Sequence, residues 1–493
     1  MRYLSTRNRN ITSSAHMSVI KGLADDGGLF VPETIDIKIS ISDFIGLTYR
    51  QTAERILSAF LDDYTPEEIS ACVAGAYDGK FDTPDIVPVT GISDGWLMEL
   101  WHGPTSAFKD IALTILPRLL TAAYKKENLA DTISILTATS GDTGKAALSG
   151  FADVEHTAVT VFYPEEGVSA VQKKQMQTSR GDNVCVIAVK GNFDDCQRMV
   201  KQACSDPKVL DSCRHVRISS ANSINVGRLI PQVVYYITSY AALVRKGALR
   251  CGDPVNFVVP TGNFGDILAG WLAKKIGLPV NRLICASNSN NVLTDFLRTG
   301  TYSTDRPFRL TMSPSMDILI SSNLERLLFM ISDGDDQFTA SCMKQLQEKG
   351  SYTVSEEILQ RIRKDFDAYW TDEQQCRDTI SELYKNEGVL IDPHTAVALH
   401  AMRQYRQADS SCPSIVLSTA SPFKFCRDVL SCISDDVPED EFEAMKKLSE
   451  KTGLPVPSGL AELETLPVRF TGSIEVSEGI DAIAERMRQL SHD

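Results

Sequence analysis

One lysine in the sequence is placed where an amine could do chemistry. Lys109 lies in the stretch HGPTSAFKDIALTILPRLL, residues 102–120. The apolar stripe behind it predicts a mostly buried helix, which Pro117 kinks or ends. The preceding GPTS predicts a turn, so Lys109 belongs to the first helical turn, where the helix dipole lowers the pKa of an amine. A free amine is the form that makes Schiff bases. An ordinary surface lysine is the alternative.

A glycine-rich turn predicts a phosphate site. The stretch PTGNFGDILAG follows an apolar strand and brings Gly262, Asn263, Phe264 and Gly265 to the start of a helix. Several backbone N–H groups can point at one anion there. A plain strand-to-helix turn, which needs no ligand, is the alternative.

A second turn resembles a nucleotide-binding P-loop but departs from its pattern. In TSGDTGKAALSG, residues 139–150, Thr139 stands at the first glycine position, and Ala146 replaces the hydroxyl that would hold magnesium. An NTPase is therefore disfavoured. The turn still offers N–H groups and hydroxyls to a carboxylate, with an ordinary capped helix start as the alternative.

Other polar residues are grouped near the ends of apolar segments. Asn225 and Arg228 precede an apolar helix in NSINVGRLIPQ, and Arg suits bidentate contacts to phosphate or carboxylate. LSTASPFKF, residues 417–425, ends a buried strand with hydroxyls and a lysine. His394 and His400 are six residues apart, so they do not share a helical face, and we expect no metal site.

The elements that position these residues alternate between strand and helix. Apolar strands are predicted within 132–138, 158–164, 255–259 and 414–418, three of them followed by polar or glycine-rich turns. This alternation favours parallel α/β sheets covered on both faces. Ligands bind at the carboxyl ends of such strands, where these turns lie.

Composition excludes several classes of protein. The chain has 493 residues, enough for two or three domains, and a net charge of -14 without a basic block, which disfavours nucleic-acid binding. No apolar run reaches the length of about 18 residues needed to cross a membrane. The 12 cysteines show no C-x-x-C spacing and predict reduced thiols.

Taken together, the motifs resemble one family. HGPTSAFKD, TSGDTG, PTGNFGD, DPHTAV and STASPFKF, with the start LADDGGLFVPE, are similar to threonine synthase, a pyridoxal-phosphate enzyme of fold type II, the tryptophan-synthase-β-like fold. The resemblance implies two open parallel-sheet α/β domains plus an N-terminal domain. We expect residues 1–92 to form the N-terminal domain, 93–130 and 216–493 the large cofactor-binding domain, and 131–215 the small domain.

The resemblance also assigns roles to residues. It implies that Lys109 forms the Schiff base with pyridoxal phosphate and that Thr419 meets its pyridine nitrogen. The phosphate group of pyridoxal phosphate would be bound by Gly262, Asn263, Phe264 and Gly265, and Asp266 follows directly in the chain. The substrate carboxylate would be bound by Ser140, Gly141, Asp142 and Thr143. For the substrate phosphate our hypothesis is Arg228 with Asn225 and Lys173.

The implied reaction converts O-phospho-L-homoserine and water to L-threonine and phosphate, by γ-elimination and β-addition of water. Two alternatives stay open. One is a related phospho-lyase that yields 2-oxobutyrate from phosphohomoserine or phosphothreonine, and the other is an inactive binding protein on this fold. The first sixteen residues have the composition of a weak organelle-targeting signal. Family members commonly begin this way, so we expect a cytoplasmic monomer or homodimer without nucleic-acid or membrane partners.

Overall fold

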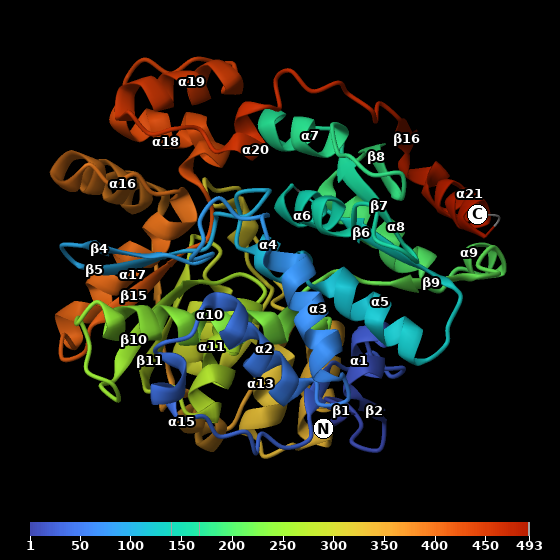
Figure 1. The fold of residues 1–493 in the computed structure, drawn as a ribbon, viewed down its shortest axis with the longest axis horizontal. Helices are drawn as coiled ribbons and strands as arrows, with labels where there is room; N and C mark the ends of the chain where they lie inside the picture. The colour runs from blue at the N-terminus through green and yellow to red at the C-terminus, as the bar shows by residue number, and fades with distance from the viewer. Residues whose placement is uncertain (140, 167, 492–493) are drawn as a thin grey trace.

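The computed structural model describes residues 1–139, 141–166 and 168–491. Two parallel sheets, each covered by helices, lie beside an N-terminal unit (Figure 1). Among these residues no helix is long and apolar enough to cross a membrane.

The larger sheet has the strand order β14-β11-β10-β15-β5-β4. Its strands run parallel except for the edge strand β4, which pairs with β5 in the antiparallel direction. Their bounds are Val89–Ile92 (β4), Gly95–Glu99 (β5), Val255–Pro260 (β10), Val280–Ser287 (β11), Phe366–Trp370 (β14) and Ser414–Ser418 (β15). The apolar runs at 255–259 and 414–417 therefore form neighbouring central strands, which are buried on both faces.

Alternate side chains of the larger sheet enter two different cores, because successive residues of a strand point to opposite faces. Phe257 and Leu283 belong to the core formed with helices α10 (Val226–Arg245) and α11 (Gly265–Ile276). Val258 and Ile284 belong to the core formed with α17 (Pro393–Ala408). Both faces are thus covered, as the α/β prediction requires.

The smaller sheet has the order β16-β8-β7-β6-β9, and all its strands are parallel. The strands are Thr132–Ala138 (β6), Thr157–Pro164 (β7), Val184–Lys190 (β8), Val216–Ser219 (β9) and Ser473–Glu475 (β16). Helix α6 (Asp142–Phe151) packs on one face. Helices α8 (Phe193–Ala203) and α21 (Gly479–Leu490) pack on the other. The predicted α/β fold with two parallel-sheet units is confirmed.

The helix that carries Lys109 is split. It forms α4 (Lys109–Leu113) and α5 (Leu116–Lys126), and the break falls just before Pro117, as the sequence predicts. Helix α4 packs very closely on α6, since a Cβ at Gly150 would lie 1.9 Å from the backbone oxygen of Leu113. This contact fixes Lys109 relative to the smaller sheet.

The N-terminal unit combines a small antiparallel sheet with three helices. Strands β1 (Arg2–Ser5), β2 (Thr12–Ser14) and β3 (Phe30–Pro32) pair in the order β2-β1-β3. Helices α1 (Ala15–Lys21), α2 (Tyr49–Phe60) and α3 (Pro66–Tyr77) follow. Thr48 and Thr65 start α2 and α3 with capping boxes. Helix α2 packs on α10 and α3 on α5, so this unit shares its core with the larger sheet.

The C-terminal segment passes from one sheet to the other. Helices α18 (Cys426–Ile433), α19 (Glu441–Thr452) and α20 (Ser458–Ala461) lie beside the larger sheet, and the chain then crosses to β16 and α21 (Figure 1). The predicted division assigns all of 216–493 to the large domain. The strand pairing instead joins β9 and β16 to the smaller sheet, while the exact domain boundaries stay a prediction.

The remaining elements complete the two sheets' surroundings and the loops between them. They are α7 (Ala170–Gln177), α9 (Pro207–Asp211), α12 (Val292–Thr299), α13 (Leu324–Ile331), α14 (Asp336–Lys349), α15 (Glu356–Arg363), α16 (Glu373–Glu387), β12 (Thr301–Ser303) and β13 (Ser351–Thr353). Short 3₁₀ turns in the described part of the chain are η1 (Ile41–Phe44), η2 (Pro314–Met316), η3 (Pro422–Phe425) and η4 (Val476–Glu478). Of these, α7, η2 and η3 contribute to the candidate site.

Candidate active site

The Lys109 loop is held against the loop that follows β15. Strands β5 and β15 are parallel neighbours, so both loops leave the same edge of the sheet. The backbone N–H of Phe108 donates to the carbonyl of Thr419 at 2.8 Å, and that of Ser421 donates to the carbonyl of Ser106 at 3.0 Å. Thr419 is 5% exposed. Lys109 and Thr419 are therefore brought together, as the sequence predicts.

The amine of Lys109 is nearly enclosed, since its side chain is 13% exposed. Its Nζ lies 3.4 Å from Oγ of Ser315 and 3.7 Å from Oδ2 of Asp142. Burial lowers the pKa of Lys109 to about 8, and the nearby cations Lys424 and Arg228 act in the same direction while Asp142 opposes them. The lowered pKa matches the expectation, but its main cause is burial and not the dipole of the short helix α4.

Asp142 is the carboxylate at the centre of the site. It is the first residue of α6 and is buried. Its Oδ1 lies 2.6 Å from Nζ of Lys424 and accepts from Gln172 at 3.2 Å, whereas its Oδ2 accepts from Ser315 at 3.0 Å. Burial alone would raise the pKa of Asp142, but Lys424 and Lys109 outweigh it and hold that pKa well below its ordinary value.

The predicted phosphate turn packs closely against the chain around Ser315 and Asn323. Phe264, the N-cap of α11, adopts a left-handed conformation with φ 61°. A Cβ at Gly262 would lie 2.9 Å from the carbonyl oxygen of Ser315, so this position needs glycine. The carbonyl of Asn263 accepts from the backbone N–H of Asn323 at 3.0 Å, while the Asn263 side chain is exposed. The turn is thus close-packed at its glycines and open at Asn263.

Asp266 points away from this turn. Tyr235 donates to its Oδ1 at 2.5 Å and Tyr236 at 2.8 Å, so its carboxyl group is used between α10 and α11. Burial raises the pKa of Asp266 to about 6, although the two tyrosine hydrogen bonds lower it. Its predicted contact with the cofactor therefore has no support in this geometry, because the helix turns its side chain into the core.

The buried Asp266 predicts a pH-dependent stability. Its folded pKa lies above that of the unfolded chain, so stability is lost as pH rises from about 4 to about 6. Asp266→Asn removes this loss and keeps an oxygen that accepts from both tyrosines. We expect Asp266→Asn to gain about 2 kcal/mol over the native chain between pH 4.5 and pH 7.5.

The measurement is the melting temperature of both proteins at the two pH values. Asp36→Asn, at an exposed carboxylate, serves as the control and should show no such gain. A difference between Asp266→Asn and the native chain that stays constant with pH would contradict the burial argument.

The turn predicted to bind a carboxylate is described in part. Ser140 lies outside the described residues. The hydroxyl of Thr139 accepts from the backbone N–H groups of Gly141 and Gly144, both at 3.0 Å, and so orders the turn. Gly141 has φ 149°, and a Cβ there would lie 2.5 Å from the side-chain amide of Gln172. Gly141 and Asp142 are buried and Thr143 is half-buried beside them.

Arg228 is a buried cation without a counter-charge in the described chain. It is 4% exposed, and its Nη1 donates to the carbonyl of Ala221 at 2.8 Å. No described carboxylate pairs with it, and its Nε has no hydrogen-bond partner there. Burial lowers the pKa of Arg228 to about 10. A buried charge is costly unless paired, so this guanidinium is suited to receive an anion.

The other two residues that we predict to bind the substrate phosphate, Asn225 and Lys173, have different surroundings. Asn225 is fully buried, its Oδ1 caps α10 at the N–H of Gly227, and its Nδ2 donates to the carbonyl of Val19 at 3.0 Å. Its amide is used within the fold, so this geometry gives the predicted contact of Asn225 with the substrate phosphate no support, and it stays a prediction. Lys173 is half-buried on α7, next to the Gln172 that contacts Asp142, and stays a prediction.

Sequence reasoning missed three residues that belong to the hydrogen-bond network of Lys109, Ser315 and Asp142. Ser315 and Gln172 belong to no motif and reach the site through η2 and α7. His394, interpreted as structural, accepts from the N–H of Ser315 at 3.2 Å through its Nε2. The resemblance of DPHTAV to the family was the one available signal for His394.

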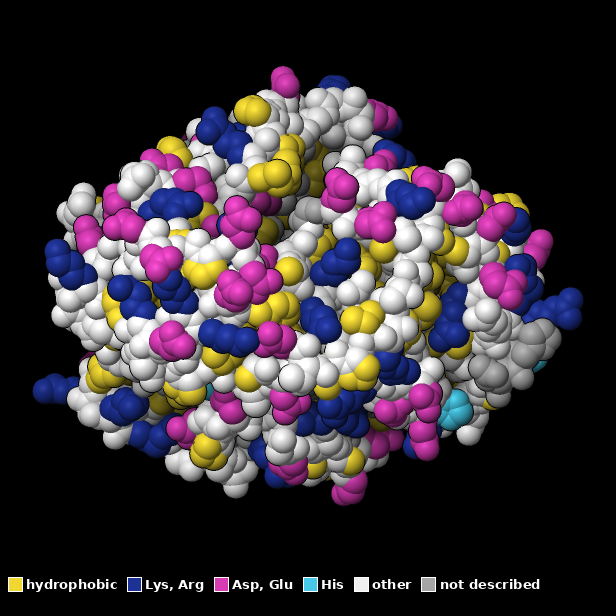
Figure 2. Space-filling model, turned by 90° about the horizontal axis from the view of Figure 1, so that it is seen from above, with side chains coloured by type: hydrophobic (Ala, Val, Ile, Leu, Met, Phe, Trp, Pro, Cys, Tyr) yellow, Lys and Arg dark blue, Asp and Glu magenta, His cyan; other side chains and the backbone are white. Residues whose placement is uncertain are grey.

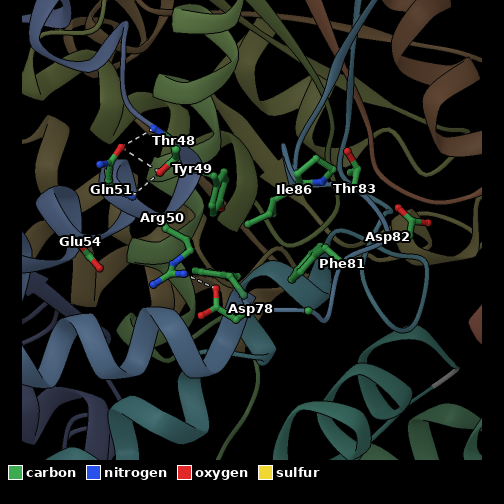
Figure 3. Close-up of a pocket in the computed structure, with 13 residues that line it drawn as sticks. Thr48, Tyr49, Arg50, Gln51, Glu54, Asp78, Phe81, Asp82, Thr83 and Ile86 are labelled. Carbon is green, nitrogen blue, oxygen red and sulfur yellow. Dashed lines mark hydrogen bonds and ion pairs between the residues drawn. The ribbon is translucent and has the colours of Figure 1, made fainter.

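A separate cavity of about 620 Å³ lies in the N-terminal unit (Figure 3). Its lining includes Arg50, Asp78 and Phe81 and contains no residue of the predicted site. On the face shown in Figure 2, acidic and basic side chains are intermixed around a central hollow. That face carries no broad basic surface of the kind that nucleic acids need.

Comparison with known proteins gives matches along most of the chain. The family model of pyridoxal-phosphate dependent enzymes matches residues 84–421. The models of the threonine synthase N terminus and C-terminal region match residues 2–77 and 395–478. These ranges contain every residue assigned to the site.

Individual relatives agree with the family models. The threonine synthase of Pseudomonas aeruginosa is 39% identical over 431 residues, 86% of this chain and 89% of the relative. Threonine synthase-like 1 of Macaca fascicularis is also 39% identical, but the chain spans 57% of its length. The crystal structure of pyridoxal-phosphate-bound threonine synthase from Brucella melitensis is 34% identical, covers 100% of both chains and has a TM-score of 0.89.

Proposed function

The chain belongs to the threonine synthase family of pyridoxal-phosphate-dependent enzymes, and we propose that it converts O-phospho-L-homoserine and water to L-threonine and phosphate. The observation that carries the proposal is the enclosed amine of Lys109, with its lowered pKa, beside Thr419 and the open turn at Asn263.

The residues present fit pyridoxal phosphate. The turn 262–265 starts helix α11, whose N-terminal N–H groups and dipole favour a phosphate. Its glycine at 262 admits no side chain. Lys109 would hold the aldehyde carbon and Thr419 would meet the pyridine nitrogen. When bound, the cofactor draws electrons from the carbon atoms next to the substrate amine.

Lys109 is suited to move protons between substrate carbons. A pKa of about 8 leaves roughly a tenth of its amine uncharged at pH 7, far more than for an ordinary lysine, and an amine in this range can both take and return a proton. We assign to Nζ of Lys109 the removal of the proton from Cα and proton transfer at Cβ. Phosphate leaves from Cγ, the proton taken from Cβ is delivered to Cγ to complete the methyl group, the hydroxyl of water adds at Cβ, and Lys109 returns the first proton to Cα.

The two charged ends of the substrate require separate anion sites. We assign the carboxylate to the turn 140–143, where the half-buried Thr143 and backbone N–H groups of a helix start are available. We assign the phosphate to Arg228, because its buried guanidinium lacks an anion and lies close enough to lower the pKa of Lys109. Lys173 is a second candidate for the phosphate.

A product assay tests the proposal. The protein loaded with pyridoxal phosphate is incubated with O-phospho-L-homoserine, and L-threonine, 2-oxobutyrate and phosphate are quantified. We expect threonine and phosphate in equal amounts. Formation of 2-oxobutyrate with ammonia as the main products would replace the proposal by the lyase alternative, and no turnover would favour the inactive binding protein.

A further inference from the structure

Lys424 is a buried lysine to which the proposed function gives no role. It lies in η3, its side chain is 0% exposed, and its Nζ has two partners on different elements. One is Oδ1 of Asp142 on α6, at 2.6 Å, and the other is the carbonyl of Thr105 in the Lys109 loop, at 2.9 Å. Lys424 thus ties three chain segments together at the site.

Asp142 lies between two amines and is shared unequally. Lys424 contacts Oδ1 at 2.6 Å, whereas Lys109 lies 3.7 Å from Oδ2, which also accepts from Ser315. Coulomb attraction falls with distance, so Lys424 forms the stronger pair. The positive charge of Lys424 therefore balances most of the negative charge of Asp142, and Lys109 contributes less.

We propose that Lys424 is a positioning residue which holds Asp142 as its own counter-ion and so leaves Lys109 free to act as an uncharged amine. The inference rests on the proposed use of Lys109 as the reacting amine. Without Lys424, Asp142 would have Lys109 as its nearest cation and would favour the charged ammonium. Without Asp142, the two amines would repel each other and Lys109 would lose its proton more readily.

Other charged groups on the packed elements contribute to the electrostatic potential at Lys109, Asp142 and Lys424. Arg228 on α10 has a Coulomb interaction with Lys109, and His394 on α17 has one with Asp142. Asp110 on α4 and Lys145 on α6 each interact in the same way with Lys424. The carboxyl of Asp110 is held by Thr105 at 2.6 Å and 2.8 Å, so it is not a competing partner of Lys109. These groups stay unchanged in the variants below.

The pair also predicts an energetic pattern. Removing one partner of a buried ion pair leaves an uncompensated charge, whereas replacing both partners by neutral groups is often nearly neutral. Lys424→Met leaves a buried carboxylate and Asp142→Asn leaves a buried ammonium. The double variant Asp142→Asn/Lys424→Met leaves neither. A purely structural role of Lys424 in holding Thr105 predicts instead that the double variant is as impaired as Lys424→Met or worse.

The test titrates Lys109 directly in the full-length chain after the cofactor has been removed. Acetic anhydride is applied at a series of pH values, and acetylation of Lys109 is quantified by peptide mass spectrometry. We expect the midpoint to rise by about one pH unit in Lys424→Met and to fall by a similar amount in Asp142→Asn. In the double variant it should return close to that of the native chain.

Activity of the loaded enzyme supplies a second readout. We expect Lys424→Met to lose kcat by about 10-fold at neutral pH, because a rise of one pH unit in the midpoint leaves about a tenth of the uncharged Lys109 amine, and we expect the double variant to be less impaired than Lys424→Met. Lys446→Met, which removes an exposed partner of Glu464, is the matched control and should keep both the midpoint and kcat. If Lys424→Met fails to fold, the opposite shift in Asp142→Asn and the return in the double variant still test the inference.

Two results would overturn the inference. One is an unchanged midpoint in both single variants, and the other is a shift in the same direction in both. Because acetylation needs neither substrate nor cofactor, failure of the inference is distinguishable from failure of the proposed function. A native enzyme that forms no threonine refutes the proposed function, while the titration still reports whether Lys424 governs Lys109.

Discussion

Lys109→Ala is expected to lower kcat for threonine formation by about 10⁴-fold or more, because one amine serves both as the attachment point of the cofactor and as the carrier of protons. The fold should survive. The Lys109 side chain makes one long hydrogen bond, 3.4 Å to Ser315, and a 3.7 Å contact with Asp142. Phosphate release and threonine formation measure the loss, and the melting temperature reports the fold.

The loss of kcat in Lys109→Ala is specific to that residue if removal of a lysine far from the site leaves kcat unchanged. Lys446→Ala, on the exposed face of α19, is the control and should turn over substrate like the native chain. Borohydride reduction of the loaded native enzyme should attach the cofactor to the peptide that contains Lys109. A Lys109→Ala enzyme that keeps more than a tenth of the native kcat would refute the assignment.

Arg228→Met is expected to raise KM for O-phospho-L-homoserine by about 10- to 150-fold. This range corresponds to about 1.5–3 kcal/mol for hydrogen bonds to a charged group. The buried guanidinium has no described counter-charge, so an anionic ligand supplies its main partner. Arg228→Lys keeps the charge but loses the forked geometry and should give an intermediate KM. Steady-state kinetics over a substrate series measures these changes.

The affinity for pyridoxal phosphate separates two anions that Arg228 could bind. If Arg228 binds the substrate phosphate, cofactor affinity stays near native while KM rises. Arg245→Met, at the exposed end of the same helix, is the control and should alter neither. An Arg228→Met enzyme with near-native KM would remove Arg228 from the substrate site, and weaker cofactor binding alone would move it to the cofactor phosphate.

The central architecture is predictable from local patterns. Strands such as 255–260 and 414–418 are continuous apolar runs that end in turns, which is how parallel strands buried on both faces read in a sequence. The break before Pro117 follows from the missing N–H of proline. Strand β16 is different, because its three residues are partly exposed and carry no periodic signal. Its pairing with β8 depends on a long-range contact.

The site was predictable where chemistry and local turns coincide. Lys109 and the turn at 262–265 were accessible because each stands at the start of an apolar helix. Ser315 was not, since it lies 206 residues from Lys109 in a segment without regular pattern. Asn225 and Asp266 are polar residues at helix starts whose side chains turn to a cap and to two tyrosines, which the sequence did not indicate. The direction of these two side chains is fixed by tertiary packing, which a local sequence pattern does not contain.

The assignment of Asp142 also changes once its partners are known. The turn containing it was interpreted as a carboxylate site, yet its own carboxylate lies between Lys424 and Lys109. A buried carboxylate in this position repels a second one unless cations balance it. Lys424 supplies that balance, so the substrate carboxylate and Asp142 can occupy neighbouring positions.

Turnover of O-phospho-L-homoserine in water enriched in ¹⁸O tests the central claim most directly. Elimination of phosphate from Cγ followed by addition of water at Cβ breaks the carbon–oxygen bond of the ester. The account therefore predicts L-threonine with solvent oxygen in its hydroxyl group and an equal amount of phosphate without solvent oxygen. Labelled phosphate together with homoserine, or 2-oxobutyrate in place of threonine, would contradict it.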